Sequence, residues 1–217
     1  MNLNPTEFPQ DEKPFSIDGD VGILECVAKS VENPKGLGII CHPHPLYQGS
    51  MHNKVVHTAA RAFNNKNLNT IRFNYRGVGE SEGEFGDSIG EVEDLNAVIR
   101  WAQSVMPNHK LWLAGFSFGS FIAAKGAILH PCQQLFTIAP AVHHQPYEQV
   151  ANVACPWVVI QGTQDEVVPP EQVYDWFQRQ QAQSHNAMQL IKLDASHYYH
   201  GTLVILRAYI ESTFLDI

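Results

Sequence analysis

The sequence predicts an α/β fold in which helices cover both faces of a mostly parallel central sheet. Short apolar runs alternate along the chain with longer segments of helical period, and this alternation is typical of parallel strands joined by crossover helices. The length of 217 residues suits one domain of this class. We therefore expect a single domain over residues 1–217, with an irregular N-terminal segment at 1–14.

The first structured element is expected to be an antiparallel hairpin over residues 15–30, because Asp18 and Gly19 form a turn dipeptide between two apolar stretches. Each later strand is expected where a short apolar run is bounded by turn-forming residues. These runs are 36–45, which ends in a proline-rich loop, then 69–77, 110–115, 134–139, 156–162 and 187–195.

Helices are expected between these strands, where apolar residues recur every three or four positions. They are 53–67, 88–106, 118–130, 169–182 and a last helix from about Tyr199. One irregular stretch interrupts the alternation, at 140–155. It is too short to form a helical lid.

Charge and hydropathy exclude several classes of partner. The net charge is −8, from 14 Lys and Arg against 22 Asp and Glu, and no run of five like charges occurs. Nucleic acids and anionic membranes attract clustered positive charge, which this chain lacks. The first fifteen residues have no secretory pattern, and no apolar run approaches the roughly 18 residues of a membrane span. We expect a cytoplasmic protein with no nucleic-acid or membrane partner.

The four cysteines, Cys26, Cys41, Cys132 and Cys155, are far apart and have neither C-x-x-C nor zinc-like spacing. Each lies in or beside an apolar run. We expect them to be buried, reduced thiols.

The motif with the clearest chemistry is Gly115-Phe116-Ser117-Phe118-Gly119, a match to G-x-S-x-G. It lies between an expected strand and an expected helix, where this pattern describes a nucleophile elbow. Glycines two positions before and after the serine allow the helix to approach the strand closely. The Ser117 hydroxyl would then lie at a helix N-terminus, which favours the negative charge that acyl transfer develops.

A serine hydroxyl needs a general base and a carboxylate that orients this base. Asp165 follows the strand expected at 156–162, and His197 follows the strand at 187–195. The order Ser, Asp, His is the one that this architecture uses. Glu166 and Asp194 compete with Asp165 for the role of the acid, and His200 competes with His197 for that of the base.

These segments resemble a family of small bacterial α/β-hydrolases that have a His-Pro-His-Pro loop and no lid. The resemblance extends from about residue 20 to the C-terminus, and its recognisable segments are "CHPHPLYQGSMHNKVV", "IRFNYRGVGESEGEF" and "LAGFSFGS". Members are similar in size to dienelactone hydrolases, but the nucleophile position here holds serine. The resemblance implies that Ser117 is the nucleophile, Asp165 the acid and His197 the base. Gln48 stands where a glycine is common.

The oxyanion of an acyl-transfer reaction would be bound by backbone N–H groups. The first is expected from Phe118, the residue after the nucleophile. The second is expected from the loop after the strand at 36–45, where prolines cannot donate, so Leu46 is our first choice and Tyr47 the second. The residues expected to line the substrate pocket are His44, Tyr47, Phe116 and Tyr198. His143 and His144 are expected to be exposed loop residues.

No metal or organic cofactor is expected. His42 and His44 form an H-x-H pattern, but no carboxylate or cysteine lies nearby at a usable spacing. The glycines at 77, 79 and 83 do not have the spacing of a dinucleotide fingerprint. We interpret them as a turn in which Arg76 pairs with Glu80 or Glu82.

The sequence thus predicts a serine hydrolase, with a carboxylesterase that acts on small or short-acyl esters as the favoured activity. Its partner would be a small acyl substrate. A thioesterase, lactonase or peptidase could use the same three residues, and a non-catalytic binding protein of the same fold is the alternative from another class. The physiological substrate and any assembly into a homo-oligomer are left open by the sequence.

Overall fold

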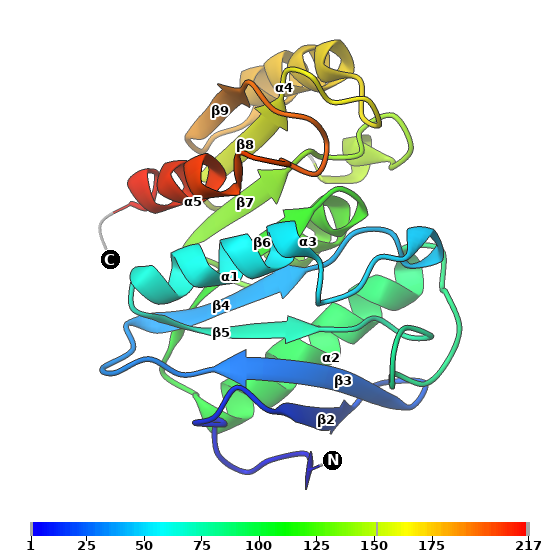
Figure 1. Cartoon of the computed structure of the whole chain (residues 1–217), viewed down its shortest axis with the longest axis vertical. Coiled ribbons are helices and arrows are strands. Elements are labelled where there is room, and N and C mark those ends of the chain that lie inside the picture. Colours follow the sequence, from blue (N-terminus) through cyan, green and yellow to red (C-terminus); the bar gives the residue numbers. More distant parts are fainter. Residues whose placement is uncertain (1, 151, 216–217) are drawn as a thin grey trace.

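The computed structural model describes residues 2–150 and 152–215, and the strands of this part of the chain form one sheet. The strands are β1 (Asn2–Leu3), β2 (Pro14–Asp18), β3 (Ile23–Lys29), β4 (Gly36–Cys41), β5 (Leu68–Phe73), β6 (Lys110–Phe116), β7 (Gln134–Ile138), β8 (Trp157–Gly162) and β9 (Met188–Leu193). Their order is β1-β2-β3-β5-β4-β6-β7-β8-β9 (Figure 1). Strand β3 is antiparallel to β2 and β5, and the other neighbours are parallel.

Five helices cover the two faces of this sheet. Helices α1 (Lys54–Asn65) and α5 (Leu203–Ser212) lie side by side on one face, in front of the sheet in Figure 1. Helices α2 (Ile89–Val105), α3 (Phe118–Leu129) and α4 (Pro170–Gln183) contribute to the hydrophobic cluster on the other face. The α/β fold predicted from the sequence is therefore confirmed.

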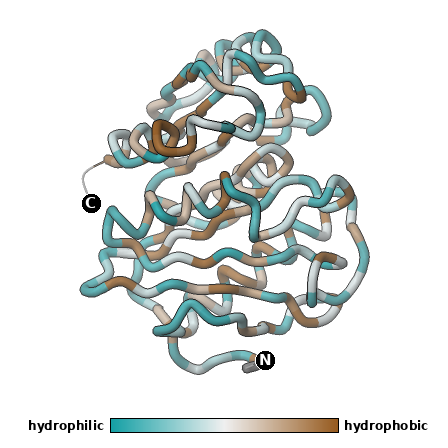
Figure 2. The backbone as a smooth tube through the Cα atoms, viewed as in Figure 1, coloured by the Kyte–Doolittle hydropathy of each residue, from teal (hydrophilic) through white to brown (hydrophobic). Residues whose placement is uncertain are grey.

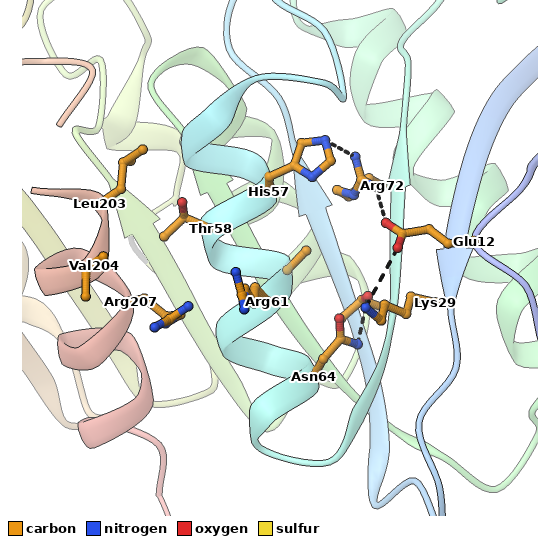
Figure 3. A pocket seen from close by; sticks show the side chains of 12 residues that line it. Glu12, Lys29, His57, Thr58, Arg61, Asn64, Arg72, Leu203, Val204 and Arg207 are labelled. Atoms are coloured by element: carbon orange, nitrogen blue, oxygen red, sulfur yellow. Dashed lines mark hydrogen bonds and ion pairs between the residues drawn. The ribbon is translucent and has the colours of Figure 1, made fainter. Parts of the chain in front are cut away.

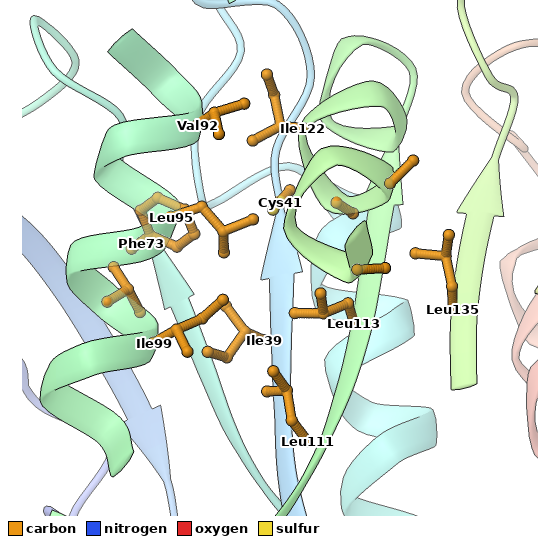
Figure 4. Packing of buried hydrophobic residues seen from close by; sticks show 14 of the residues in the cluster. Ile39, Cys41, Phe73, Val92, Leu95, Ile99, Leu111, Leu113, Ile122 and Leu135 are labelled. Carbon is orange, nitrogen blue, oxygen red and sulfur yellow. The ribbon is translucent and has the colours of Figure 1, made fainter. Parts of the chain in front are cut away.

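The core is a layer of apolar side chains on each face of the sheet. Every residue of β4, β5, β7 and β8 is buried, as expected for parallel strands covered on both sides. Leu95 of α2 and Ile122 of α3 pack over Ile39 and Leu113 of the central strands (Figure 4). Hydrophobic residues follow the strands, and hydrophilic ones gather in the loops (Figure 2).

Helix boundaries follow local capping chemistry. Asn53 caps α1, because its side-chain oxygen accepts the N–H of Val55 at 2.8 Å. The last helix begins at Leu203, later than the expected start near Tyr199. Tyr199 and Gly201 both have positive φ, 54° and 75°, so the backbone there forms a turn before helical geometry starts.

The N-terminal segment 1–14, expected to be irregular, contains the short strand β1 and the buried side chain of Phe8. β1 pairs parallel to β2, which itself begins at Pro14. Phe8 is buried against Trp101, and the Trp101 indole donates a hydrogen bond to the Pro5 carbonyl at 3.0 Å.

Within the described residues, no helix combines the length and the apolar character that crossing a membrane would require.

Candidate active site

Ser117 lies at a sharp turn between β6 and α3. Its backbone has φ 54° and ψ −117°, a conformation that non-glycine residues rarely adopt and that costs free energy unless neighbours enforce it. The Ser117 N–H donates to the Ile138 carbonyl of β7 at 2.8 Å, and the Ser120 hydroxyl donates to the Gly115 carbonyl at 2.8 Å. These bonds hold the turn, so Ser117 stands at the N-terminus of α3.

The two glycines of the motif are required by close backbone approach. A Cβ on Gly115 would overlap the carbonyl of Gly119, and a Cβ on Gly119 would overlap the carbonyl of His42. The second contact brings the start of α3 against the loop that follows β4. The two glycines of the motif are therefore needed for two close backbone contacts, in addition to the turn itself.

Asp165 and His197 meet at the ends of β8 and β9. His197 Nδ1 lies 2.9 Å from Asp165 Oδ2 and 3.1 Å from Oδ1, and both residues are buried. The competing residues Glu166, Asp194 and His200 are exposed. Of the carboxylates and histidines considered from the sequence, the structure pairs Asp165 with His197.

A close crossing of two loops produces this pairing. A Cβ on Gly162, at the end of β8, would overlap the carbonyl of Ala195 in the loop after β9. The Gln164 N–H donates to the same carbonyl at 3.0 Å. Because the loops touch here, Asp165, one position after Gln164, and His197, two positions after Ala195, reach each other.

The Asp165 carboxylate is stabilised in its charged form. Burial raises its pKa, but the hydrogen bond from His197 and the N–H groups of Val168 (2.7 Å) and Val167 (2.9 Å) outweigh burial, so the pKa lies below its usual value. Gln161 donates a further hydrogen bond at 3.0 Å. An ionised Asp165 is suited to hold the His197 ring with its Nδ1 protonated.

The His-Pro-His-Pro loop uses its two histidines differently. His42 is fully buried: its Nδ1 lies 2.7 Å from the Pro43 carbonyl, and its Nε2 accepts the Tyr75 N–H at 3.1 Å. Burial lowers the pKa of His42 to about 3, which keeps the ring neutral. His44 instead points toward the elbow, with its ring centroid 4.8 Å from that of Phe118.

The expected role of Leu46 is not supported by its position. The Leu46 N–H donates to His44 Nδ1 at 3.2 Å, and the Tyr47 N–H donates to the His44 carbonyl at 3.1 Å. Both groups are therefore engaged within the turn. Gln48 ends this turn with φ 62°, which explains why a glycine would suit the position.

A cavity of about 570 Å³ opens between the elbow, the loop after β4 and the loops after β7, β8 and β9. Ser117, His197, His44, Tyr47 and Tyr198 all line it. Its other lining residues, which the sequence did not single out for the pocket, are Pro43, Gln48, Gly49, Asn53, Phe118, Ala141, His143, His144, Gln145, Val167 and Val168.

The expected position of Phe116 in the pocket needs correction. Phe116 is fully buried and does not line the cavity; its ring lies beside His197, with the centroids 5.0 Å apart. His144 is exposed, as expected, and His143 is half-buried; both form part of the cavity wall. The path of the loop after β7 brings them there, and no local sequence pattern predicts that path.

The loop after β5 is held by a buried ion pair. The Arg76 side chain lies 2.8 Å from the fully buried Asp94 and 3.0 Å from Glu93, and the Arg76 N–H also donates to Asp94 at 2.8 Å. The expected pairing of Arg76 with Glu80 or Glu82 is wrong, because α2 carries Asp94 beneath the loop.

A second cavity, of about 410 Å³, lies between α1, α5 and the strands β3 and β5, and Ser117 does not line it (Figure 3). Arg72 is buried at its edge. It donates to the Met51 carbonyl at 3.0 Å and lies 2.7 Å from both His57 Nε2 and Glu12 Oε1. Burial and the Arg72 charge together lower the pKa of His57.

Replacing Arg72 with methionine should lower the free energy of unfolding by roughly 1–3 kcal/mol, because the Met51 carbonyl loses a buried donor. Lys29→Met is the matched control: Lys29 is exposed and lies 3.8 Å from the same Glu12, so its loss should cost less than about 0.5 kcal/mol. Urea unfolding of both variants measures this difference. Equal stability of the two variants would contradict the structural role of Arg72.

Two family models and one curated relative match large parts of the chain. A family model for serine aminopeptidases (S33) matches residues 48–151, and one for the prolyl oligopeptidase family matches residues 139–211. An uncharacterized protein of Rickettsia prowazekii is 34% identical over 184 residues, which are 79% of this chain and 75% of that protein.

Two solved structures are similar over almost the whole chain. An α/β serine hydrolase homologue from Coxiella burnetii is 40% identical, with a TM-score of 0.91 and coverage of 96% of this chain and 100% of that one. An α/β serine hydrolase without a lid from Xanthomonas campestris is 37% identical, with a TM-score of 0.86 and coverage of 95% and 94%. The chain belongs to the α/β-hydrolase superfamily and is a member of its serine hydrolases.

Proposed function

We propose that this protein hydrolyses small carboxylic esters through an acyl-serine intermediate on Ser117. The observation that carries the proposal is the buried contact of His197 with Asp165 at 2.9 Å, made at the same cavity where the strained elbow presents Ser117. Nucleophilic catalysis by serine requires a base, a carboxylate that orients the base, and a serine hydroxyl at the substrate cavity.

In this mechanism His197 Nε2 takes the Ser117 proton as the serine oxygen attacks the acyl carbon. His197 then returns the proton to the leaving alcohol, and Asp165 stabilises the imidazolium that forms in between. A water molecule, activated by the same base, attacks the acyl-serine and releases the acid. The Asp165–His197 hydrogen bond keeps Nδ1 protonated, which leaves Nε2 free to accept the proton.

The oxyanion is proposed to bind the backbone N–H groups of Phe118 and His44. The first N–H groups of a helix lack intrahelical acceptors, and Phe118 is the first residue of α3. In the loop after β4, Leu46 and Tyr47 use their N–H groups within the turn. His44 lines the cavity and contacts the Phe118 ring, so it replaces Leu46 as our choice for the second donor.

Short acyl groups are proposed because the part of the chain that the structure describes has no α-helix between β7 and β8, where a lid would lie. The described residues of that segment, 139–150 and 152–156, include the short 3₁₀ helix η2 (Tyr147–Val150). Tyr47 at the cavity is 79% exposed, and Tyr198 is 40% exposed. An open site with aromatic walls can hold a small substrate but cannot enclose a long acyl chain.

A fluorophosphonate probe tests the proposal without knowledge of the substrate, because it reacts only with a serine that has a working base and oxyanion site. We expect one phosphonyl group on the Ser117 peptide by mass spectrometry. Ser120→Ala, which changes a second serine of the same turn, should still be labelled. Absence of labelling in the folded wild-type protein would overturn the proposed nucleophile.

Amide hydrolysis is the second candidate, since both matching family models carry the names of peptidase families. A matched set of acetyl and butyryl esters, thioesters, lactones and aminoacyl amides separates the two. The ester proposal predicts the highest kcat/KM on the short esters. A higher kcat/KM on the amides would replace it with a peptidase.

A further inference from the structure

Two cysteines that are distant in the sequence meet in the fold. The Sγ atoms of Cys132 and Cys155 lie 3.1 Å apart, although 23 positions separate the residues in the chain. Cys132 is partly exposed and Cys155 is buried. We propose that this pair is an oxidative modification site, at which peroxide converts the two thiols into a disulfide.

The fold explains why these two thiols are neighbours. Cys132 precedes β7 and Cys155 precedes β8, and the two strands are parallel neighbours with Leu135 opposite Trp157. The Leu135 N–H donates to the Pro156 carbonyl at 2.9 Å. The backbone segments that follow the two cysteines are therefore held together before any bond between the sulfur atoms forms, and this preorganisation favours a disulfide.

The contact between the two sulfur atoms also changes the pKa values of both thiols. The hydrogen bond between the two sulfur atoms raises the pKa of Cys132 and lowers the pKa of Cys155, because one proton is shared between them. The thiolate is the reactive form of cysteine. Cys41 offers the contrast: it is fully buried in β4, and burial raises the pKa of its thiol to about 12.

The reaction balances with hydrogen peroxide as the oxidant. One thiolate of the pair attacks a peroxide oxygen, the O–O bond breaks, and a sulfenic acid and one water form. The second sulfur attacks the sulfenic sulfur and displaces its oxygen, which leaves as a second water. Two thiols and one peroxide thus yield one disulfide and two waters.

The disulfide would close a covalent ring around residues 132–155. This ring contains β7, η2 and the cavity residues His143 and His144. Neither Cys132 nor Cys155 lines the cavity; they lie at the edge of the sheet where the parallel strands begin, whereas Ser117 follows the end of β6. The inference is therefore independent of the proposed activity.

The test is peroxide treatment of the full chain, followed by alkylation of free thiols and mass spectrometry. We expect loss of two hydrogen atoms and protection of only Cys132 and Cys155. Trypsin leaves both cysteines in one peptide, 126–179, so the digest should use a protease that cleaves after glutamate. Cleavage at Glu148 then separates peptides 94–148 and 149–166, which stay joined only by the disulfide.

Cys132→Ser and Cys155→Ser should each abolish the linked peptides, whereas Cys26→Ala, at a buried cysteine outside the pair, should retain them. The oxidised protein should unfold at a Tm higher on the order of 5 °C, reversibly with dithiothreitol, because the ring restricts the unfolded chain. A stable sulfinic acid at either cysteine, disulfide-linked dimers, or a Tm that does not rise would each overturn the inference.

Discussion

Ser117→Ala should reduce the kcat for p-nitrophenyl acetate hydrolysis by a factor on the order of 10⁶, to the level of residual binding and oxyanion effects. In the proposed mechanism all three residues act through one nucleophile, because His197 and Asp165 activate an oxygen that alanine lacks. Initial rates at saturating substrate, measured with wild-type protein at matched concentration, check the result.

Ser120→Ala is the control for this variant. The Ser120 hydroxyl bonds to the Gly115 and Ile138 carbonyls at 2.8 and 3.0 Å, so its removal should cost about 1 kcal/mol of stability. Its hydrolysis rate should fall far less than that of Ser117→Ala, because the nucleophile and its base are still present. If Ser117→Ala retained the activity, another residue would be the nucleophile.

Asp165→Asn should lower kcat by roughly 10⁴ with little change in the fold. An asparagine oxygen can still accept the N–H groups of Val167 and Val168 at 2.9 and 2.7 Å. Its amide group then faces His197 as a donor, which forces Nδ1 to become the acceptor and puts the proton on Nε2. A ring in that tautomer cannot take the proton of Ser117. Steady-state kinetics measure the loss.

Asp194→Asn is the matched control, because Asp194 follows the neighbouring strand and is exposed. Its kcat should equal that of wild type. Loss of activity in Asp194→Asn together with normal activity in Asp165→Asn would reverse the assignment that the sequence left open between them.

Asp165→Asn should also change how the stability of the protein depends on pH. The pKa of Asp165 is lower in the folded protein than in the unfolded chain, so its charge stabilises the fold above the unfolded pKa of about 3.9. This stabilisation is lost as the pH falls through the folded pKa. The Tm difference between wild type and Asp165→Asn should therefore be largest near neutral pH and shrink in acid, as measured by calorimetry across pH.

Local sequence pattern was sufficient to predict most of the helices and strands and the turn at Ser117. The G-x-S-x-G spacing encodes the contacts of Gly115 and Gly119, and strand and helix periods report which side of each element is buried. The late start of α5 escaped this reasoning, because apolar spacing does not show that Tyr199 adopts a positive φ.

Local sequence pattern predicts the alternation of strands and helices, the turn at Ser117, and the chain order of the proposed nucleophile, acid and base. Tertiary structure alone decided which loops touch. The crossing at Gly162 brings Asp165 to His197, the turn at His44 engages the Leu46 N–H, and the pairing of β7 with β8 brings Cys132 beside Cys155. These contacts depend on which strands become neighbours, and that order is set by the packing of the whole sheet rather than by the residues on either side of each site.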